Sequence, residues 1–151
     1  MDPWYFAYGS NLHHAQLIER CGQLSASDEL PRVVRLPNYR LAFNMDGGDG
    51  EVYANIITPG NGVLGVIYRC KAAALAKLDV YETGYDRLDV TVVDEQGSAL
   101  PAIAYIAQPT SVTAERRPHP EYLQIILTGA RAHGLPQDYT REIERLAMAT
   151  T

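Results

Sequence analysis

The central part of the chain, residues 33–106, is a series of short apolar and β-branched runs separated by breaks that contain Gly, Pro, Asn or Asp. Each run has the length of a strand rather than of a helix. The runs that we expect to be strands are residues 33–36, 39–43, 52–58, 63–70, 87–93 and 100–106. Most of them follow one another with too few residues between them for a parallel crossover. This region therefore predicts a mostly antiparallel sheet.

The breaks themselves predict turns. The sequence Pro59-Gly60-Asn61-Gly62 separates the runs 52–58 and 63–70, and Gly and Asn tolerate the positive φ angles of tight turns, so we predict a hairpin there. Residues 45–50 and 94–97 also have turn composition. Residues 46–51 superficially resemble a calcium-binding loop but lack its alternating ligands and its length, which favours a plain hairpin turn.

Helical patterns occupy the ends of the chain and one segment in its middle. The expected helices are residues 12–21, 71–80, 121–133 and 138–149, and residues 4–8 form a further short strand. Gly22 ends the first helix, and Ser10 or Asn11 could cap its start. With about six or seven strands and four helices, the pattern predicts an α+β fold in which a mostly antiparallel sheet, open or closed, is flanked by helices. We expect one domain, residues 1–151.

Charge and cysteine content narrow the class of protein. The net charge is −5, and Arg116-Arg117 is the largest basic cluster, so a nucleic-acid partner is not expected. Apolar stretches are too short to span a bilayer, and the first residues lack the pattern of a signal peptide. Cys21 and Cys70 could pair, but reduced thiols in a cytoplasmic protein are favoured.

Tyrosine dominates the aromatic residues, with ten Tyr against two Phe and one Trp. A buried tyrosine hydroxyl needs a hydrogen-bond partner, so this excess suggests an interior with polar points, such as a lined pocket.

Two segments could carry chemistry. In Tyr8-Gly9-Ser10-Asn11, between a strand and a helix, Gly9 would let the backbone approach an anionic ligand, although an ordinary helix cap explains the same residues. In residues 78–87, Glu82 lies two residues before Gly84, and a tight turn could project its carboxylate into a cavity. Burial would then raise its pKa into the range useful for proton transfer, whereas a solvated surface acid is the alternative. The four histidines have no metal-ligand spacing, and no metal site is expected.

Taken together and in order, the motifs resemble the γ-glutamyl cyclotransferase family. They are Tyr5-Phe6-Ala7-Tyr8-Gly9-Ser10-Asn11-Leu12, Ala54-Asn55-Ile56, residues 63–68, Leu78-Asp79-Val80-Tyr81-Glu82, residues 120–126 and residues 129–136. The resemblance implies a small mixed β-barrel with flanking helices and one cavity. It also implies that a γ-glutamyl amino acid is converted into 5-oxoproline and a free amine, without a cofactor.

The family pattern also assigns roles to individual residues. It implies that Glu82 is the general acid/base and that the substrate is held by Tyr5, Phe6, Ala7, Tyr8, Gly9, Ser10 and Tyr122. One departure is that Thr83 separates Glu82 from Gly84, where many members have Gly directly after the Glu, and this leaves the position of Tyr85 and Arg87 open.

On this basis we expect the tyrosines to divide into two sets. The cavity set is Tyr5, Tyr8, Tyr81, Tyr85 and Tyr122, and the packing set is Tyr39, Tyr53, Tyr68, Tyr105 and Tyr139.

Several alternatives remain at the level of the sequence. The substrate could be a γ-glutamyl amine or a γ-glutamyl-tagged biosynthetic intermediate, and a non-catalytic small-molecule binding module on the same fold is a reading of a different class. The expected partner is a small molecule, with neither nucleic acid nor membrane. Both a monomer and a homodimer are compatible with the sequence.

Overall fold

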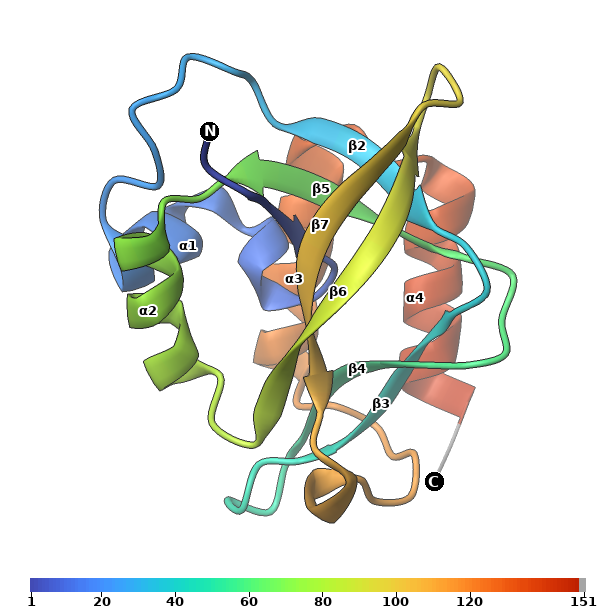
Figure 1. Cartoon of the computed structure of the whole chain (residues 1–151). Coiled ribbons are helices and arrows are strands. Elements are labelled where there is room, and N and C mark those ends of the chain that lie inside the picture. Colours follow the sequence, from blue (N-terminus) through green and yellow to red (C-terminus); the bar gives the residue numbers. More distant parts are fainter. Residues whose placement is uncertain (150–151) are drawn as a thin grey trace.

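A closed five-stranded barrel forms the centre of the molecule in the computed structural model, which describes residues 1–149 (Figure 1). Its strands are, in chain order, β1 (Trp4–Ala7), β2 (Arg32–Leu36), β5 (Val63–Arg69), β6 (Tyr85–Asp94) and β7 (Ala99–Ala107). Around the barrel the order is β1-β5-β2-β6-β7, and it closes through a parallel pairing of β1 with β7 while the other pairs are antiparallel. The predicted mixed, mostly antiparallel barrel in an α+β fold is therefore confirmed.

The two remaining strands, β3 (Arg40–Asp46) and β4 (Val52–Ile57), form a separate antiparallel sheet below the barrel (Figure 1). The predicted turn at residues 45–50 joins the two strands, although β3 continues through Met45 to Asp46 before the chain turns. The pairing of β3 with β4 shifts register between Phe43 and Met45. The seven predicted strands are thus divided between two sheets, with five of them in the barrel.

The hairpin predicted between residues 52–58 and 63–70 is wrong. β4 pairs with β3, whereas β5 pairs with β1 and β2, so the segment between them crosses from one sheet to the other. Gly60 lies against the backbone of Tyr39, where a Cβ would come within 2.3 Å of the Tyr39 carbonyl carbon, and the Gly62 N–H donates to the Tyr39 carbonyl oxygen at 2.8 Å. Gly60 and Gly62 therefore allow the segment between β4 and β5 to pass close to the Tyr39 backbone, and they do not form a hairpin turn.

Four α-helices flank the sheets: α1 (His14–Cys21), α2 (Ala72–Tyr81), α3 (Pro120–Ala132) and α4 (Gln137–Ala149). Helices α1 and α2 lie together at one side of the barrel, α3 lies behind it, and α4 lies on the other side (Figure 1). Two short 3₁₀ turns, η1 (Ser10–Leu12) and η2 (Pro109–Ser111), complete the fold. Helix α1 therefore begins two residues later than the predicted start at residue 12, because η1 precedes it. Its N-terminal cap is the His13 side chain rather than Ser10 or Asn11.

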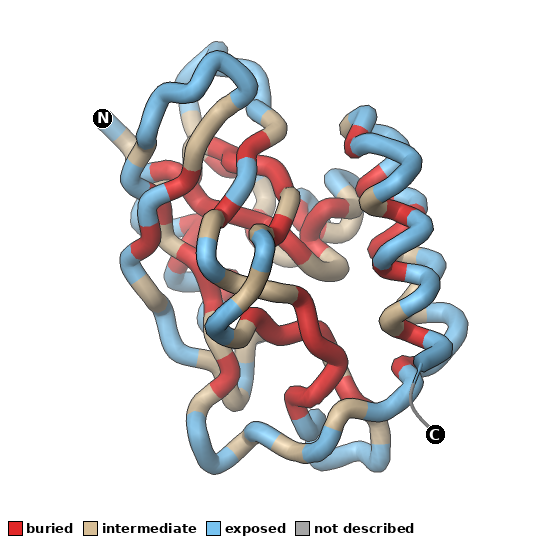
Figure 2. Tube along the Cα trace, turned by 90° about the vertical axis from the view of Figure 1, so that its right-hand side faces the viewer, coloured by how far each residue is buried: buried red, intermediate tan, exposed pale blue. Residues whose placement is uncertain are grey.

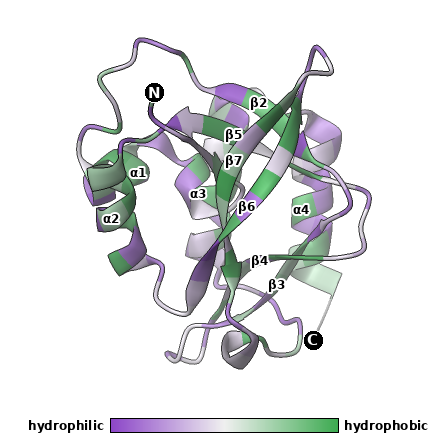
Figure 3. Cartoon of the chain, viewed as in Figure 1, coloured by the Kyte–Doolittle hydropathy of each residue, from purple (hydrophilic) through white to green (hydrophobic). Residues whose placement is uncertain are grey.

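The core fills the barrel and the layer between the barrel and the helices. Buried positions follow the inner strands, while the helices alternate buried and exposed faces (Figure 2). Hydropathy follows the same division, with hydrophobic stretches along the strands and hydrophilic residues in most loops (Figure 3). Phe6, Ile67, Leu78 and Ile126 are fully buried. Burial of this apolar surface is the main force that holds the layers together.

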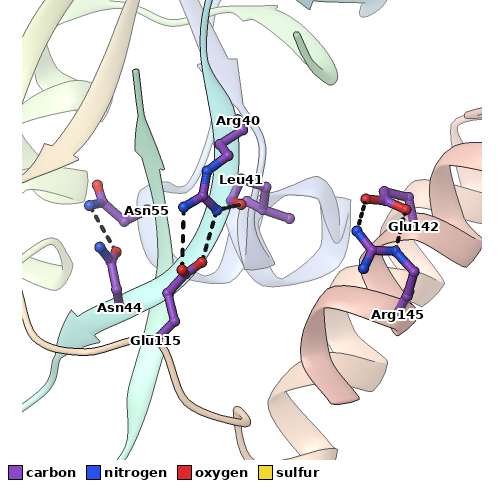
Figure 4. Close-up of polar contacts among 7 residues, drawn as sticks. All are labelled: Arg40, Leu41, Asn44, Asn55, Glu115, Glu142 and Arg145. Atoms are coloured by element: carbon purple, nitrogen blue, oxygen red, sulfur yellow. Dashed lines mark hydrogen bonds and ion pairs between the residues drawn. The ribbon is translucent and has the colours of Figure 1, made fainter. Parts of the chain in front are cut away.

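One buried amide connects the small sheet to the barrel. Asn55 on β4 donates through Nδ2 to Asn44 Oδ1 on β3 at 3.0 Å (Figure 4), and its Oδ1 accepts from the Ala107 N–H on β7 at 2.9 Å. Ion pairs lie at the surface of the molecule, and one of them joins Arg40 on β3 to Glu115 (Figure 4). The cavity described next depends on the small sheet keeping its place beside the barrel.

Candidate active site

A cavity of about 610 Å³ opens where the first loop, the end of α2, the small sheet and the start of α3 meet. Seven of the ten tyrosines line it: Tyr5, Tyr8, Tyr53, Tyr81, Tyr85, Tyr105 and Tyr122. All five tyrosines of the expected cavity set are among them. Tyr53 and Tyr105 were expected to pack in the scaffold. Tyr105 is buried in the core as expected but also borders the cavity, and Tyr53 lines the cavity wall, because alternation along a strand does not reveal which face meets a cavity.

Glu82 occupies the C-terminal cap of α2, where its N–H donates to the Leu78 carbonyl. The next three residues form a turn in which Gly84 has φ of 88° and the Tyr85 N–H donates to the Glu82 carbonyl at 3.1 Å. The inserted Thr83 is accommodated by this turn, and its hydroxyl donates to the Val80 carbonyl. Glu82 thus lines the cavity, as expected from a tight turn at Gly84.

The pKa of Glu82 is raised to about 7, primarily by burial of its carboxyl group. The positive charge of Arg20 and a hydrogen bond from Asn11 counteract part of this increase, and the negative charge of Asp79 adds to it. A carboxyl group with such a pKa exchanges its proton near neutral pH, as a general acid/base must.

Asn11 holds the Glu82 carboxylate in place. Its Nδ2 donates to Glu82 Oε1 at 3.1 Å and to the Tyr5 hydroxyl at 3.0 Å, while its Oδ1 accepts from Gln16 and Arg20, each at 3.3 Å. The other carboxylate oxygen, Oε2, has no hydrogen-bond partner within residues 1–149. Sequence reasoning treated Asn11 as a helix cap. The relation that defines its role spans 71 residues, and local patterns do not contain it.

Tyrosine hydroxyls fix the walls of the cavity. The Ala54 N–H on β4 donates to the Tyr122 hydroxyl at 3.0 Å, and the Tyr85 hydroxyl donates to the Ala54 carbonyl at 2.7 Å. The Tyr8 hydroxyl donates to the Tyr105 carbonyl at 2.7 Å. Burial raises the pKa values of Tyr5, Tyr8, Tyr85 and Tyr122, so these hydroxyls stay protonated at neutral pH.

Not every expected site residue faces the cavity. Of the loop residues, Tyr5, Tyr8, Gly9 and Ser10 line it together with Tyr122. Phe6 and Ala7 are fully buried and are not among the lining residues. Phe6 points to the face of β1 opposite Tyr5, because side chains alternate along a strand. Arg87, whose position was open, pairs with Asp79 at 2.7 Å, and the Tyr105 hydroxyl donates to the same carboxylate at 2.5 Å.

Within residues 1–149 no group of three or more His, Cys, Asp and Glu could hold a metal ion. No helix in this part of the chain is long and apolar enough to cross a membrane. Cys21 and Cys70 are both free and buried.

Comparison with known proteins places this arrangement in a family. The model of the AIG2-like family matches residues 62–143. The chain is 32% identical to gamma-glutamylcyclotransferase of Bos taurus and 30% identical to that of Homo sapiens, in each case over 94% of this chain and 77% of the relative. A solved structure of a gamma-glutamyl cyclotransferase superposes with a TM-score of 0.81 at 27% identity, covering 95% of this chain and 87% of the other. The chain therefore belongs to the AIG2-like family and, within it, to the γ-glutamylcyclotransferases.

Proposed function

We propose that the protein is a γ-glutamyl cyclotransferase, a single domain of residues 1–151 that converts a γ-glutamyl amino acid into 5-oxoproline and the free amino acid. The observation that carries the proposal is Glu82, whose carboxylate faces a tyrosine-lined cavity and has a pKa of about 7. One of its oxygens is bound by Asn11, and the other has no partner among residues 1–149. Family membership supports the same assignment.

The first step is removal of a proton from the substrate's α-ammonium group. Such a group has a pKa above that of the carboxylate, so the transfer is uphill. Raising the pKa of Glu82 from 4.5 to about 7 makes the transfer less unfavourable by about 2.5 pK units than with an ordinary glutamate. The raised pKa of Glu82 therefore makes it an effective base for this amine.

The free amine then attacks the γ-carbonyl carbon of the same molecule and closes a five-membered ring. The new C–N bond pushes an electron pair onto the carbonyl oxygen, and when that pair returns, the bond to the leaving nitrogen breaks. Glu82 returns its proton to the leaving nitrogen, and the regenerated carboxylate then carries the second proton of the ring nitrogen to the released amine. The products are a neutral lactam and an ammonium group, so the carboxylate is restored and the proton balance closes. Because the substrate supplies the nucleophile, the reaction requires neither a Ser or Cys nucleophile nor a cofactor.

In this scheme the glutamyl half of the substrate is bound by residues that line the cavity. We assign the glutamyl group to the segment Tyr5 to Ser10, of which Tyr5, Tyr8, Gly9 and Ser10 line the cavity, and to Tyr122 on the opposite wall. The protonated hydroxyl of Tyr5, which accepts from Asn11, can donate to a carboxylate or carbonyl oxygen, whereas the Tyr8 hydroxyl already donates to the Tyr105 carbonyl. The rest of the acceleration comes from holding the substrate in the folded conformation that ring closure requires.

The assignment is tested with Glu82→Gln, which retains the side-chain shape and an oxygen that can accept from Asn11. We expect a loss of roughly 10²–10⁴-fold in 5-oxoproline release from γ-glutamyl-alanine, with the fold intact by circular dichroism. Glu95→Gln, at an exposed turn, is the matched control. Near wild-type release by Glu82→Gln would remove Glu82 from the mechanism. A wild-type protein that binds glutamate or 5-oxoproline but turns over no γ-glutamyl compound would identify a binding module.

We further propose a cytoplasmic location, which rests on the two free, buried thiols.

A further inference from the structure

Arg20, in the last turn of α1, is the only Arg or Lys among the described residues that line the cavity. Its side chain is half-buried, and its positive charge is close enough to Glu82 to lower the pKa of that carboxyl group. Neither the motif pattern nor the spacing of charged residues in the sequence singled it out.

The partners of Arg20 are neutral. The guanidinium donates through Nη1 to Asn11 Oδ1 at 3.3 Å and stacks over the Tyr81 ring, with its central carbon 5.2 Å from the ring centroid. No carboxylate within residues 1–149 lies at ion-pair distance from it, in contrast to Arg87 and Arg145, which pair with Asp79 and Glu142. One wall of the cavity therefore carries a fixed cation that has further N–H donors and no anionic partner in the described part of the chain.

We propose that Arg20 binds the carboxylate of the leaving amino acid and thereby selects γ-glutamyl amino acids over γ-glutamyl amines. This proposal rests on the proposed cyclotransferase function. A γ-glutamyl amino acid carries two carboxylates, of which the glutamyl one is assigned above to the Tyr5 to Ser10 segment. The second carboxylate belongs to the leaving group, and a γ-glutamyl amine lacks it.

The position of Arg20 relative to Glu82 favours the leaving group. Glu82 must reach the leaving nitrogen to protonate it, and the carboxylate carbon of a leaving amino acid is only two bonds from that nitrogen. Arg20 lies next to Glu82 through their common partner Asn11. The planar guanidinium matches the two oxygens of a carboxylate, and stacking on Tyr81 holds that plane in a defined orientation.

Arg20 also acts on Glu82 itself, and the experiment must separate the two effects. Loss of the positive charge raises the pKa of Glu82 further, which moves the acid limb of the pH profile to higher pH for every substrate. Loss of a contact to the leaving carboxylate affects only substrates that have one. Comparing two substrates within one variant therefore cancels the first effect.

The test compares γ-glutamyl-alanine with γ-glutamyl-ethylamine, which differs by lacking the carboxylate. For Arg20→Gln we expect kcat/KM to fall roughly 10- to 100-fold more for γ-glutamyl-alanine than for γ-glutamyl-ethylamine, the magnitude of a lost charge-assisted hydrogen bond. The difference should lie mainly in KM, since the contact exists in both ground and transition state. Arg20→Lys should recover part of it, and exposed Arg141→Gln should change neither substrate.

Each result decides the proposal. Equal losses for both substrates, or no loss, would overturn it, since Arg20 would then act on the glutamyl half, on Glu82 alone or on nothing. A wild-type protein that processes γ-glutamyl-ethylamine as well as γ-glutamyl-alanine would overturn it too, while leaving the cyclotransferase function intact. A wild-type protein inactive on both substrates would instead refute the proposed function. If Arg20→Gln does not fold, the selectivity of Arg20→Lys decides.

Discussion

At the scale of single residues, the site is organised by the side-chain amide of Asn11. Arg20 is always a donor, so its contact forces Oδ1 of the amide toward Arg20 and leaves Nδ2 to face Glu82 and Tyr5. The orientation of one amide thus determines that Glu82 has one oxygen bound and the other without a partner in the described chain. A carboxylate arranged in this way accepts a proton at a defined atom.

The raised pKa of Glu82 predicts a pH-dependent cost in stability. Its pKa is about 7 in the folded protein and close to 4.5 in the unfolded chain, so the folded state binds the extra proton between these values. Stability from this group is therefore fully present below about pH 4.5 and is lost as pH rises through about 7. Relative to wild type, Glu82→Gln should gain about 1–3 kcal/mol in free energy of unfolding between pH 5 and pH 8.

Urea denaturation of both proteins at pH 5, 7 and 8 measures this difference, with Glu95→Gln as control. A difference between Glu82→Gln and wild type that stays constant over this range would show that the carboxyl group is not desolvated in the folded protein.

At the scale of elements, the position of the first loop depends on close packing of α3 against η1. Gly129 in α3 lies directly on the backbone of η1 and the residue after it, where a Cβ would come within 2.4 Å of the Leu12 carbonyl carbon and the His13 nitrogen. Only glycine lets the two backbones approach so closely. The helix thereby supports the loop that contains Ser10 and Asn11.

Gly129→Ala should therefore destabilise the protein although alanine is the better helix former. The gain in helix propensity is about 1 kcal/mol, and the overlap with backbone atoms must push the elements apart, so we expect a net loss of about 2 kcal/mol. Cyclotransferase activity should fall as well, because the loop moves. Thr128→Ala, one residue earlier on the exposed face of α3, is the control. Thermal unfolding and 5-oxoproline release measure both effects, and a stabilised, fully active Gly129→Ala protein would contradict this account.

At the scale of the whole molecule, the cavity lies where the small β3–β4 sheet meets the barrel and the helices. Tyr122 from α3 and Tyr85 from β6 bind the N–H and the carbonyl of Ala54, so a single residue of β4 is fastened to two other parts of the fold. The next residue, Asn55, is bound to β3 and β7. The cavity wall is thus maintained by contacts between elements distant in sequence.

Asn55→Ala tests this joint. The change leaves the Ala107 N–H and the Asn44 side chain without their buried partner, at a cost of about 2–4 kcal/mol. Exposed Asn61→Ala, in the crossing segment after β4, should be neutral within about 0.5 kcal/mol. Chemical denaturation compares the two variants. Equal stability of Asn55→Ala and Asn61→Ala would show that the amide does not join the sheets.

The sequence predicted most of the elements because strand and helix periodicity is local. It also predicted that Glu82 faces a cavity, through the turn after α2, and that the pocket is polar and rich in tyrosine. The acid/base role of Glu82 stays a prediction. It failed for the hairpin at residues 59–62, because Pro, Gly and Asn mark a break in a strand without stating which strands pair. The place of Tyr53 and Tyr105 beside the cavity was missed for a related reason: the face that a strand presents to a cavity depends on its neighbours.

By itself, then, the sequence determined which segments are strands and helices and to which family the chain belongs, since these depend on local pattern and on motifs. Only the tertiary structure decided that the strands divide between a barrel and a small sheet, that Asn11 bridges Glu82 and Tyr5, and that Arg20 lines the cavity without an ion pair to any residue from 1 to 149. These features arise from contacts between residues far apart in the chain. Pairing partners, burial and hydrogen-bond geometry are set by the packing of the whole molecule, and no short window of sequence contains them.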